Sequence, residues 1–305
     1  MTKMPGDFAS VTAGRCGRKA ASALALLCGI VALSTSASAV AAPSCDAACL
    51  TRLADEYLRH LAANDPSGLP LGTHFRASEN AKTIRLGEGA WGKATGVAQQ
   101  QVLVEPDKGE VVAYSLLKLK HGNVAAYAVR LKVTGQLIAE AEALNGNTEI
   151  SAAQMAKSSV NAVGGATPIP AAQRMSRQSL VNTAEHFFKA LKSGNEASGR
   201  FAPDCYRIDG VYRATCVGTV HEGAPGNLRP RNVRTFLVDP ALGLVGSFFF
   251  LDMYGMKPIP DLPTAPPEIH LYSVVLTRVE NDKIVAVWEI ATQVQKDSRS
   301  PFESR

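Results

Sequence analysis

Two short stretches of this chain hold residues whose types could carry out proton transfer. The first is GEGAWG at residues 87–92, in which Glu88 precedes Trp91 by three positions. Glycines let a backbone approach a ligand closely, and a carboxylate beside an indole can acquire a raised pKa and act as a general base. The alternative is a structural turn in which Trp91 fills the interior and Glu88 lies in solvent.

The second stretch is FFFLDMY, where alternation along a strand puts four side chains on one face: Phe248, Phe250, Asp252 and Tyr254. Three aromatic rings would then flank one carboxylate. If that face lines a cavity, Asp252 is a candidate general base and the Pro-rich residues 255–267 are a candidate lid. If it does not, Asp252 lies hydrated at the rim.

Four further residues are candidates for ligand contacts. A buried tyrosine hydroxyl can polarise a carbonyl oxygen, as an oxyanion-hole donor does. Tyr114 and Tyr127 lie on long predicted strands, where a core tyrosine with a satisfied hydroxyl is the alternative. His270 and Tyr272 share one face of the strand that follows residue 267. Their distance from Asp252 depends on the strand register, which alternation alone does not specify.

Several familiar catalytic motifs are absent from the sequence. The chain has no G-x-S-x-G, no P-loop, no H-E-x-x-H and no cysteine nucleophile with a paired histidine. We therefore expect no cofactor, and we leave open whether the protein is an enzyme.

The elements that position these residues occur twice. Residues 54–80 and 184–210 align without a gap at a constant offset of 130. Helical spacing of apolar residues predicts helices over residues 50–61 and 179–192. The expected strands of the first copy are 75–78, 83–86, 100–104, 110–120, 124–133 and 136–144. The expected strands of the second copy are 201–208, 212–216, 233–238, 243–254, 268–279 and 283–292.

This order of elements predicts an α+β fold in which each copy is a long helix packed on a curved antiparallel sheet. Short glycine-containing turns connect most of the strands, which is typical of antiparallel neighbours. We expect a signal peptide at 1–39, a first domain at 45–145, a linker at 146–175, a second domain at 176–293 and a frayed polar tail at 294–305.

The N-terminus has the features of an export signal. Arg15, Arg18 and Lys19 precede an apolar stretch at 20–33. The small-residue sequence Ala37-Ser38-Ala39 follows as a cleavage site, with Val40-Ala41 as a second option. That stretch is too short to span a bilayer, so we expect a periplasmic or extracellular protein without a membrane span. Without residues 1–39 the chain has 28 basic and 26 acidic residues, a balance that indicates no nucleic-acid partner.

Four cysteines remain after the signal, in two local pairs. Cys45 and Cys49 are one helical turn apart, and Cys205 and Cys216 flank a predicted turn. In an exported chain an even number of cysteines indicates disulfides, and we expect these local pairings. Zinc binding is the alternative, but neither pair has a histidine at a standard spacing, so we expect no metal.

Several stretches carry a family resemblance: CDAACL at 45–50, YLRHLAANDPSGLPL at 57–71, RLGEGAWG at 85–92, LKVTGQLIAEAE at 131–142 and FAPDCYRIDG at 201–210. They resemble exported bacterial and fungal proteins of unknown function with two NTF2-like units in tandem. The NTF2-like superfamily includes ketosteroid isomerase, scytalone dehydratase and the SnoaL-like cyclases. The resemblance implies two open cones lined with side chains, and it carries over no site residues.

Three functions are compatible with this resemblance. The first is binding of a small, largely apolar molecule in the cones. The second is a cofactor-independent isomerase, dehydratase or lyase that uses a carboxylate base. The third is a structural role, in which the two copies form a pseudo-dimer within one chain.

Overall fold

The computed structural model describes residues 45–151, 153–154, 167–194, 200–210, 212–216, 227–255 and 268–303. All of them belong to one compact unit, residues 42–305. The predicted signal peptide at 1–39 and nearly all of the predicted lid at 255–267 lie outside the described residues.

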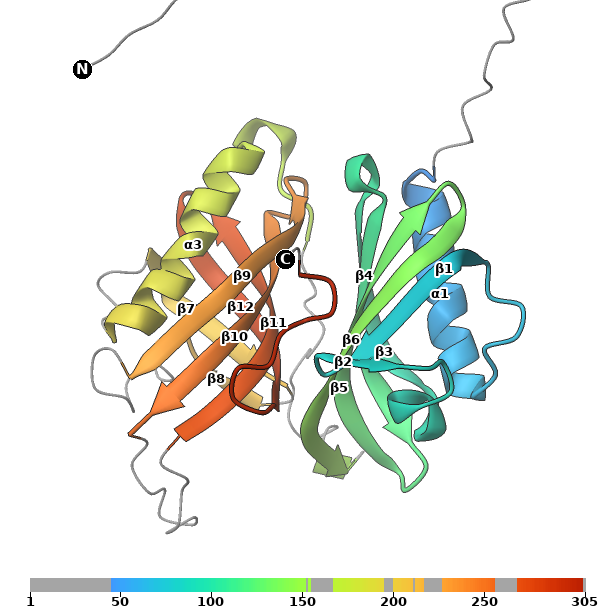
Figure 1. Cartoon of the computed structure of the whole chain (residues 1–305). Helices are drawn as coiled ribbons and strands as arrows, with labels where there is room; N and C mark the ends of the chain where they lie inside the picture. Colours follow the sequence, from blue (N-terminus) through green and yellow to red (C-terminus); the bar gives the residue numbers. More distant parts are fainter. Residues whose placement is uncertain are drawn as a thin grey trace, which may run out of the picture. The chain divides into compact units, whose positions relative to one another are not determined.

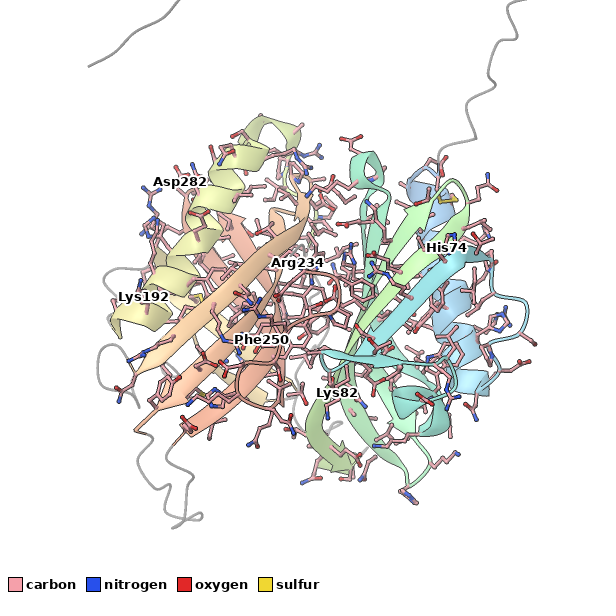
Figure 2. All side chains as sticks on the ribbon, in the orientation of Figure 1. His74, Lys82, Lys192, Arg234, Phe250 and Asp282 are labelled. Carbon is pink, nitrogen blue, oxygen red and sulfur yellow. A yellow bond between two sulfur atoms is a disulfide. The ribbon has the colours of Figure 1, made fainter. Side chains whose placement is uncertain are left out.

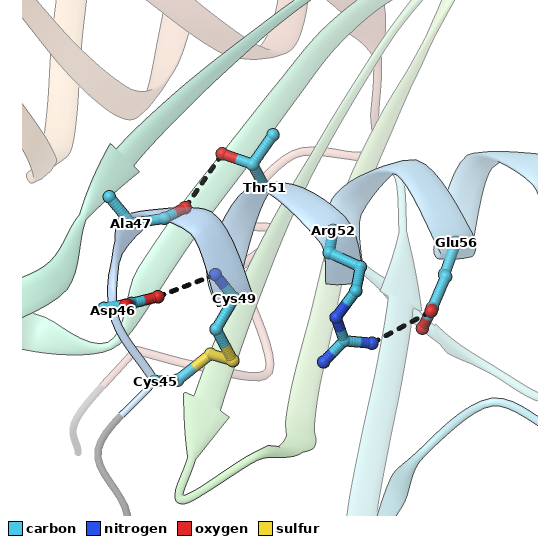
Figure 3. The surroundings of a disulfide bond; sticks show 7 residues. All are labelled: Cys45, Asp46, Ala47, Cys49, Thr51, Arg52 and Glu56. Atoms are coloured by element: carbon cyan, nitrogen blue, oxygen red, sulfur yellow. Dashed lines mark hydrogen bonds and ion pairs between the residues drawn. A yellow bond between two sulfur atoms is a disulfide. The ribbon is translucent and has the colours of Figure 1, made fainter.

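The first half begins with α1 (Ala47–Ala63), which confirms the predicted helix. Asp46 caps it, because its carboxylate accepts the Cys49 N–H at 2.9 Å, and Asn64 ends it in the left-handed conformation with φ 52°. The predicted disulfide between Cys45 and Cys49 is confirmed and closes the first turn (Figure 3).

Six strands follow α1 and form one sheet in the order β2-β1-β6-β5-β4-β3. Neighbours are antiparallel except β1 and β6, which are parallel. Two short 3₁₀ helices, η1 (Gly89–Gly92) and η2 (Pro106–Lys108), join strands. The strands are β1 (Leu71–Glu79), β2 (Lys82–Ile84), β3 (Ala94–Glu105), β4 (Glu110–Leu119), β5 (Asn123–Thr134) and β6 (Leu137–Ser151).

The second half repeats this order. After η3 (Ala171–Gln173), α3 (Arg177–Ser193) begins at Ser176, whose hydroxyl accepts the Ser179 N–H at 3.1 Å. The second sheet has the order β8-β7-β12-β11-β10-β9, with β7 and β12 parallel. Its strands are β7 (Phe201–Asp209), β8 (Tyr212–Thr215), β9 (Leu228–Asp239), β10 (Leu244–Tyr254), β11 (Glu268–Glu280) and β12 (Lys283–Gln293). The disulfide between Cys205 and Cys216 is confirmed.

The central strands of each sheet are largely buried on both faces. In Figure 1, α1 lies along one face of the first sheet and α3 along one face of the second. The apolar side chains of each helix share a core cluster with one face of their sheet. The opposite faces of the two sheets share a third cluster, which includes Tyr114 and Leu116 from β4 and Phe248 and Tyr272 from the second sheet.

A polar network lies between the sheets, centred on the buried Glu142 of β6. Its carboxylate accepts hydrogen bonds from Arg234 at 2.6 Å, from the Tyr272 hydroxyl at 2.6 Å and from Ser300. Arg130 lies 3.5 Å from the other carboxylate oxygen. One carboxylate therefore joins β5 and β6 to the second sheet and to the C-terminal segment.

Two sequence expectations about boundaries are wrong. The first sheet does not end at residue 145, because β6 continues to Ser151 and pairs with β5 at Asn123. The segment after Gln293 is not frayed as far as residue 303. Ser300 is buried against Glu142, and Arg231 donates to the Ser298 carbonyl at 3.0 Å, so these contacts hold the segment on the sheets.

Candidate functional site

The α1-facing interior of the first half is filled by its own aromatic side chains. Trp91 has no exposed surface, and its indole N–H donates to the Tyr57 hydroxyl at 3.3 Å. The two rings meet edge to face with centroids 5.2 Å apart. Tyr127, also fully buried, belongs to the same cluster. Of the two interpretations of the GEGAWG motif, this geometry matches the one in which Trp91 fills the interior.

The carboxylate that lies deep beside this cluster is Glu79, not Glu88. Glu79 accepts the Ala90 N–H at 3.0 Å, and burial raises its pKa. Gly89 has φ +66°, and a Cβ there would lie 2.4 Å from a Glu79 oxygen, so the motif needs glycine at this position.

Glu88 itself is about half exposed, with 47% of its side chain in solvent. It accepts hydrogen bonds from the Arg85 backbone at 3.0 Å and from the Arg85 guanidinium at 3.1 Å. These interactions hold the pKa of Glu88 below its usual value. The raised pKa expected for Glu88 beside Trp91 is therefore wrong, and Glu88 stays a catalytic candidate by residue type alone.

The α3-facing side of the second sheet has polar side chains at several positions where the first sheet has apolar ones. A row of directly paired residues crosses five strands there: Thr235, Ser247, Val275, Glu289 and Asp209. Val275 belongs to the core cluster of α3, so the row faces the helix. The corresponding row of the first sheet is Val102, Ala113, Val129, Ala143 and Glu79.

Glu289 is the centre of this polar row and is only 2% exposed. Its carboxylate lies 2.8 Å from the guanidinium of Arg207, which is itself 7% exposed. Burial raises the pKa of Glu289, the Arg207 charge opposes that shift, and the Asp209 carboxylate adds to it. The nearby Ser273 hydroxyl also acts on this carboxylate. The second half thus holds a buried ion pair where the first half has Ala77 and Ala143.

A groove of about 370 Å³ lies between α3 and the edge of the same sheet. Its apolar walls include Val181 and Phe188 of α3 and Val233 of β9, and Thr235 and Ser247 of the polar row lie in its lining. The Thr235 and Ser247 hydroxyls are 3.0 Å apart. Ser247 and Glu289 are two strands apart in the row, which corresponds to about 10 Å.

The face of β10 that carries Phe248, Phe250 and Asp252 points away from α3. Phe249 of β10 contacts the rings of Phe187 and Phe188 on α3, at 6.4 and 5.1 Å between centroids. Phe248 and Phe250 therefore point away from α3, and both lie in the cluster shared with the first sheet. Figure 2 labels Phe250 and Arg234 on that side of the sheet. Asp252 therefore does not line the interior covered by α3.

Asp252 and His270 are nevertheless direct partners. They face each other in the register of β10 and β11, and His270 Nδ1 lies 2.8 Å from an Asp252 oxygen. Arg231 donates to the other oxygen at 2.9 Å. Burial raises the pKa of Asp252, but the hydrogen bonds from Arg231 and His270 outweigh it, so the pKa lies below its usual value. This geometry orients the imidazole, whose Nε2 is buried.

The other predicted ligand residues are distributed over both sides of the sheets. Tyr127 faces α1, whereas Tyr114 and Tyr272 lie between the sheets, where Tyr272 donates to Glu142. Burial raises the pKa of all three hydroxyls. Tyr254 lies at the end of β10, with the Arg229 guanidinium over its ring at 4.8 Å. The structure therefore brings Asp252, His270 and Tyr254 together and leaves Glu88, Trp91 and Tyr127 in the other half.

Sequence reasoning missed Arg207 and Glu289. The signal that could have found Glu289 is its place in KIVAVWEIATQ, where one carboxylate interrupts a strand that is otherwise largely apolar. Arg207 occurs in a repeat-matched stretch, and the position at the same offset in the first half is Ala77. A charge that replaces alanine at the same position of a repeat indicates a local change of environment.

Neither a metal site nor a membrane span is found in the part of the chain that the structure describes. No cluster of three or more histidine, cysteine, aspartate or glutamate side chains there could hold a metal ion. No helix there has the length and apolar character needed to cross a bilayer.

Comparisons with known proteins concern the fold. Residues 173–291 match a family model described as "Domain of unknown function (DUF8021)". None of the curated proteins matches this chain. Among solved structures, a "putative polyketide cyclase" from Silicibacter sp. TM1040 has 12% identity and a TM-score of 0.32, and the match covers 40% of this chain and 94% of that one.

Two further solved structures are similar to a comparable extent. A "Putative SnoaL-like polyketide cyclase" from Jannaschia sp. CCS1 has 14% identity and a TM-score of 0.31, with 39% of this chain and 90% of that chain covered. A de novo designed protein with a curved β-sheet has 15% identity and a TM-score of 0.29, with 33% and 88% covered. The activities named belong to those proteins.

Proposed function

We propose that this chain is an exported binding protein whose second half holds a small, largely apolar molecule carrying one polar group. The ligand would lie on the α3-facing side of the second sheet. The first half, filled by Trp91, Tyr57 and Tyr127, would serve as a scaffold. The two halves would be tandem NTF2-like units, of which one is closed and one is specialised.

The observation that carries this proposal is the difference between the two equivalent rows. Ala113 and Ala143 of the first sheet correspond to Ser247 and Glu289 of the second. Burying a hydroxyl or a carboxylate costs free energy unless it is paired, whereas a buried alanine carries no such cost. Polar groups at interior positions that a related sheet fills with alanine are typical of a site that recognises a ligand.

The groove beside α3 gives such a ligand apolar contact. Phe188, Val181 and Val233 supply apolar surface at its wall, and Val233 is 43% exposed. A volume near 370 Å³ falls in the lower part of the range of small-molecule sites, about 300–1,000 Å³. A ligand about 10 Å long would reach from this wall toward Glu289, given the spacing of strands.

Export is part of the proposal and rests on the cysteines and the N-terminal sequence. Both disulfides, Cys45–Cys49 and Cys205–Cys216, are formed, and disulfides persist in oxidising compartments. The basic and apolar residues before position 40 have the pattern of a secretory signal.

Native mass spectrometry of non-reduced protein purified from its own source tests the binding function. We expect a bound mass that disappears on denaturation and identifies the ligand. In parallel, the neutral fluorescent probe N-phenyl-1-naphthylamine should bind the purified chain, and Phe188→Ala should weaken that binding about tenfold. Leu137→Ala, which removes an exposed apolar side chain outside this groove, is the matched control. Equal probe affinity in Phe188→Ala and wild type would contradict the proposal.

A second candidate function, proton transfer by a cofactor-independent isomerase, dehydratase or lyase, is favoured by one observation. Glu289 is buried and its pKa is raised, which brings a carboxylate closer to the range of a useful general base. The lowered pKa values of Asp252 and Glu88 make those carboxylates weaker bases. Incubation of the released ligand with the chain in D₂O would distinguish turnover, seen as deuterium uptake that Glu289→Gln abolishes, from binding alone.

The structural candidate, an intrachain pseudo-dimer, is favoured by the cluster between the sheets and by the Glu142 network. It is compatible with ligand binding, because these contacts use the faces turned away from α1 and α3. We therefore propose the pseudo-dimer as the framework of the binding protein, with no nucleic acid or metal involved.

A further inference from the structure

A second groove, of about 430 Å³, lies on the first half beside β1 and β2 and is completed by the C-terminal segment. Its apolar lining comes from residues 71–86 and from the C-terminal segment. Besides the buried Ala77, it consists of six larger side chains: Leu71, Phe75, Ile84, Leu86, Pro301 and Phe302. All six side chains are half-buried, so each presents apolar surface to solvent at this place.

The charges in this groove are of one sign. Arg76 and Arg85 belong to the lining, and no acidic residue does. Their side chains are 56% and 91% exposed, so both guanidiniums can reach a ligand at the surface. An apolar groove with two cations at its rim is complementary to a molecule that is apolar along its length and anionic at one end.

Arg76 and Arg85 can each turn from their present carboxylate partner to a ligand. Glu140, which lies 2.5 Å from Arg76, is also 3.3 Å from Arg130, so its charge stays compensated when Arg76 turns outward. Arg85 pairs with Glu88 at 3.1 Å in a largely exposed ion pair, and exposed pairs of this kind contribute little to stability. Engaging either arginine therefore costs little.

The C-terminal wall of the groove is held in place by contacts outside it. Ser300 hydrogen-bonds to the buried Glu142, and the Arg231 side chain donates to the Ser298 carbonyl. Phe302 lies under Arg76, with the guanidinium 4.8 Å from its ring centroid. The wall is thus preorganised and needs little further ordering when a ligand binds.

We propose that this groove binds an amphipathic carboxylate. The alkyl or aryl part lies against Phe75, Ile84 and Phe302, and the carboxylate is bound by Arg76 and Arg85. This site is separate from the one under α3, and the inference does not rest on the proposed function. It assigns a role to the C-terminal segment, which supplies two of the apolar residues.

Isothermal titration with octanoate and with 1-octanol tests the proposal on the full chain. We expect octanoate to bind at least tenfold more tightly than the alcohol. The double variant Arg76→Gln/Arg85→Gln should lose about tenfold in octanoate affinity and keep its affinity for the alcohol. Phe302→Ala should weaken both ligands. Arg52→Gln, which removes an exposed arginine of α1 that pairs with Glu56, is the matched control and should change neither.

Two results would overturn the inference. Equal affinities for octanoate and octanol would show that the arginines do not recognise the carboxylate. Unchanged octanoate binding in the double arginine variant would place the ligand elsewhere. Since Arg85 is exposed, Arg85→Gln alone should fold normally and provides the same test if the double variant does not. Phe188→Ala separates the two grooves, because it should weaken N-phenyl-1-naphthylamine binding and leave octanoate binding unchanged.

Discussion

Replacing Arg207 with methionine tests the buried ion pair of the second half. Methionine has a similar length and no charge, so Glu289 would remain in an interior position without its cation, 2.8 Å away in the native protein. Breaking a buried pair by removing one partner costs about 3–5 kcal/mol, because the remaining charge is uncompensated. We expect Arg207→Met to lower the free energy of unfolding by that amount at pH 7, measured by urea denaturation.

The size of this loss should depend on pH in a defined direction. The pKa of Glu289 is already raised above its ordinary value of 4.5 by burial, and Arg207 is the main influence that lowers it. Without Arg207 the pKa rises further, and a carboxyl whose folded pKa is raised contributes stability below the unfolded pKa and loses it as pH rises through the folded pKa. The defect of Arg207→Met should therefore be small below about pH 4.5 and grow between that pH and neutrality.

The double variant Arg207→Met/Glu289→Met provides the control. Replacing both charges with apolar groups of similar volume is often neutral or stabilising, so it should recover most of the loss and remove the pH dependence. A loss that is the same at pH 4 and pH 7 would refute the reasoning. So would a double variant as unstable as the single one, since the defect would then come from lost packing and not from an uncompensated carboxylate.

Three other perturbations give separate tests. Trp91→Ala should cost about 3–5 kcal/mol in calorimetric unfolding, because it empties the filled interior, whereas Glu88→Gln should stay within about 0.5 kcal/mol. The stability difference between wild type and Asp252→Asn should be full above about pH 4 and shrink as pH falls through the lowered pKa of Asp252, as acid titration of unfolding will show. Replacing Cys205 and Cys216 by alanine should cost about 2–3 kcal/mol in urea unfolding, and intact mass should show the missing bond.

The repeated order of elements could be predicted from the sequence because it depends on local signals. Apolar residues at helical spacing and a capping side chain define α1, and glycine or Asx turns separate β4, β5 and β6. The same signals recur at an offset of 130 residues in the first part of each repeat. The cysteine pairs were likewise local, within 4 and 11 residues of each other. Both kinds of inference needed no knowledge of how distant strands meet.

The site could not be predicted in the same way, and β10 shows why. Alternation correctly grouped Phe248, Phe250 and Asp252 on one face, but the side chains of residues 244–251 are buried on both faces. When one face of a strand is solvated, the polar residues on that face identify the opposite face as the core side. A strand between a helix and a second sheet has no such marker. The choice between the two faces was therefore open, and the aromatic face packs on the first sheet.

Under the proposed binding function, the two halves divide between them the demands of stability and ligand recognition. In the first half, alanines at 77, 113 and 143 let Trp91, Tyr57 and Tyr127 fill the space under α1. In the second, Arg207, Ser247 and Glu289 occupy the matching positions, and their burial contributes less to folding than apolar contacts of the same volume would. The apolar cluster shared by the two sheets then stabilises the polar half through the filled one. Because a structural role alone would not favour a charged pair at alanine positions, the difference between the repeats is itself an argument that the second half recognises a ligand.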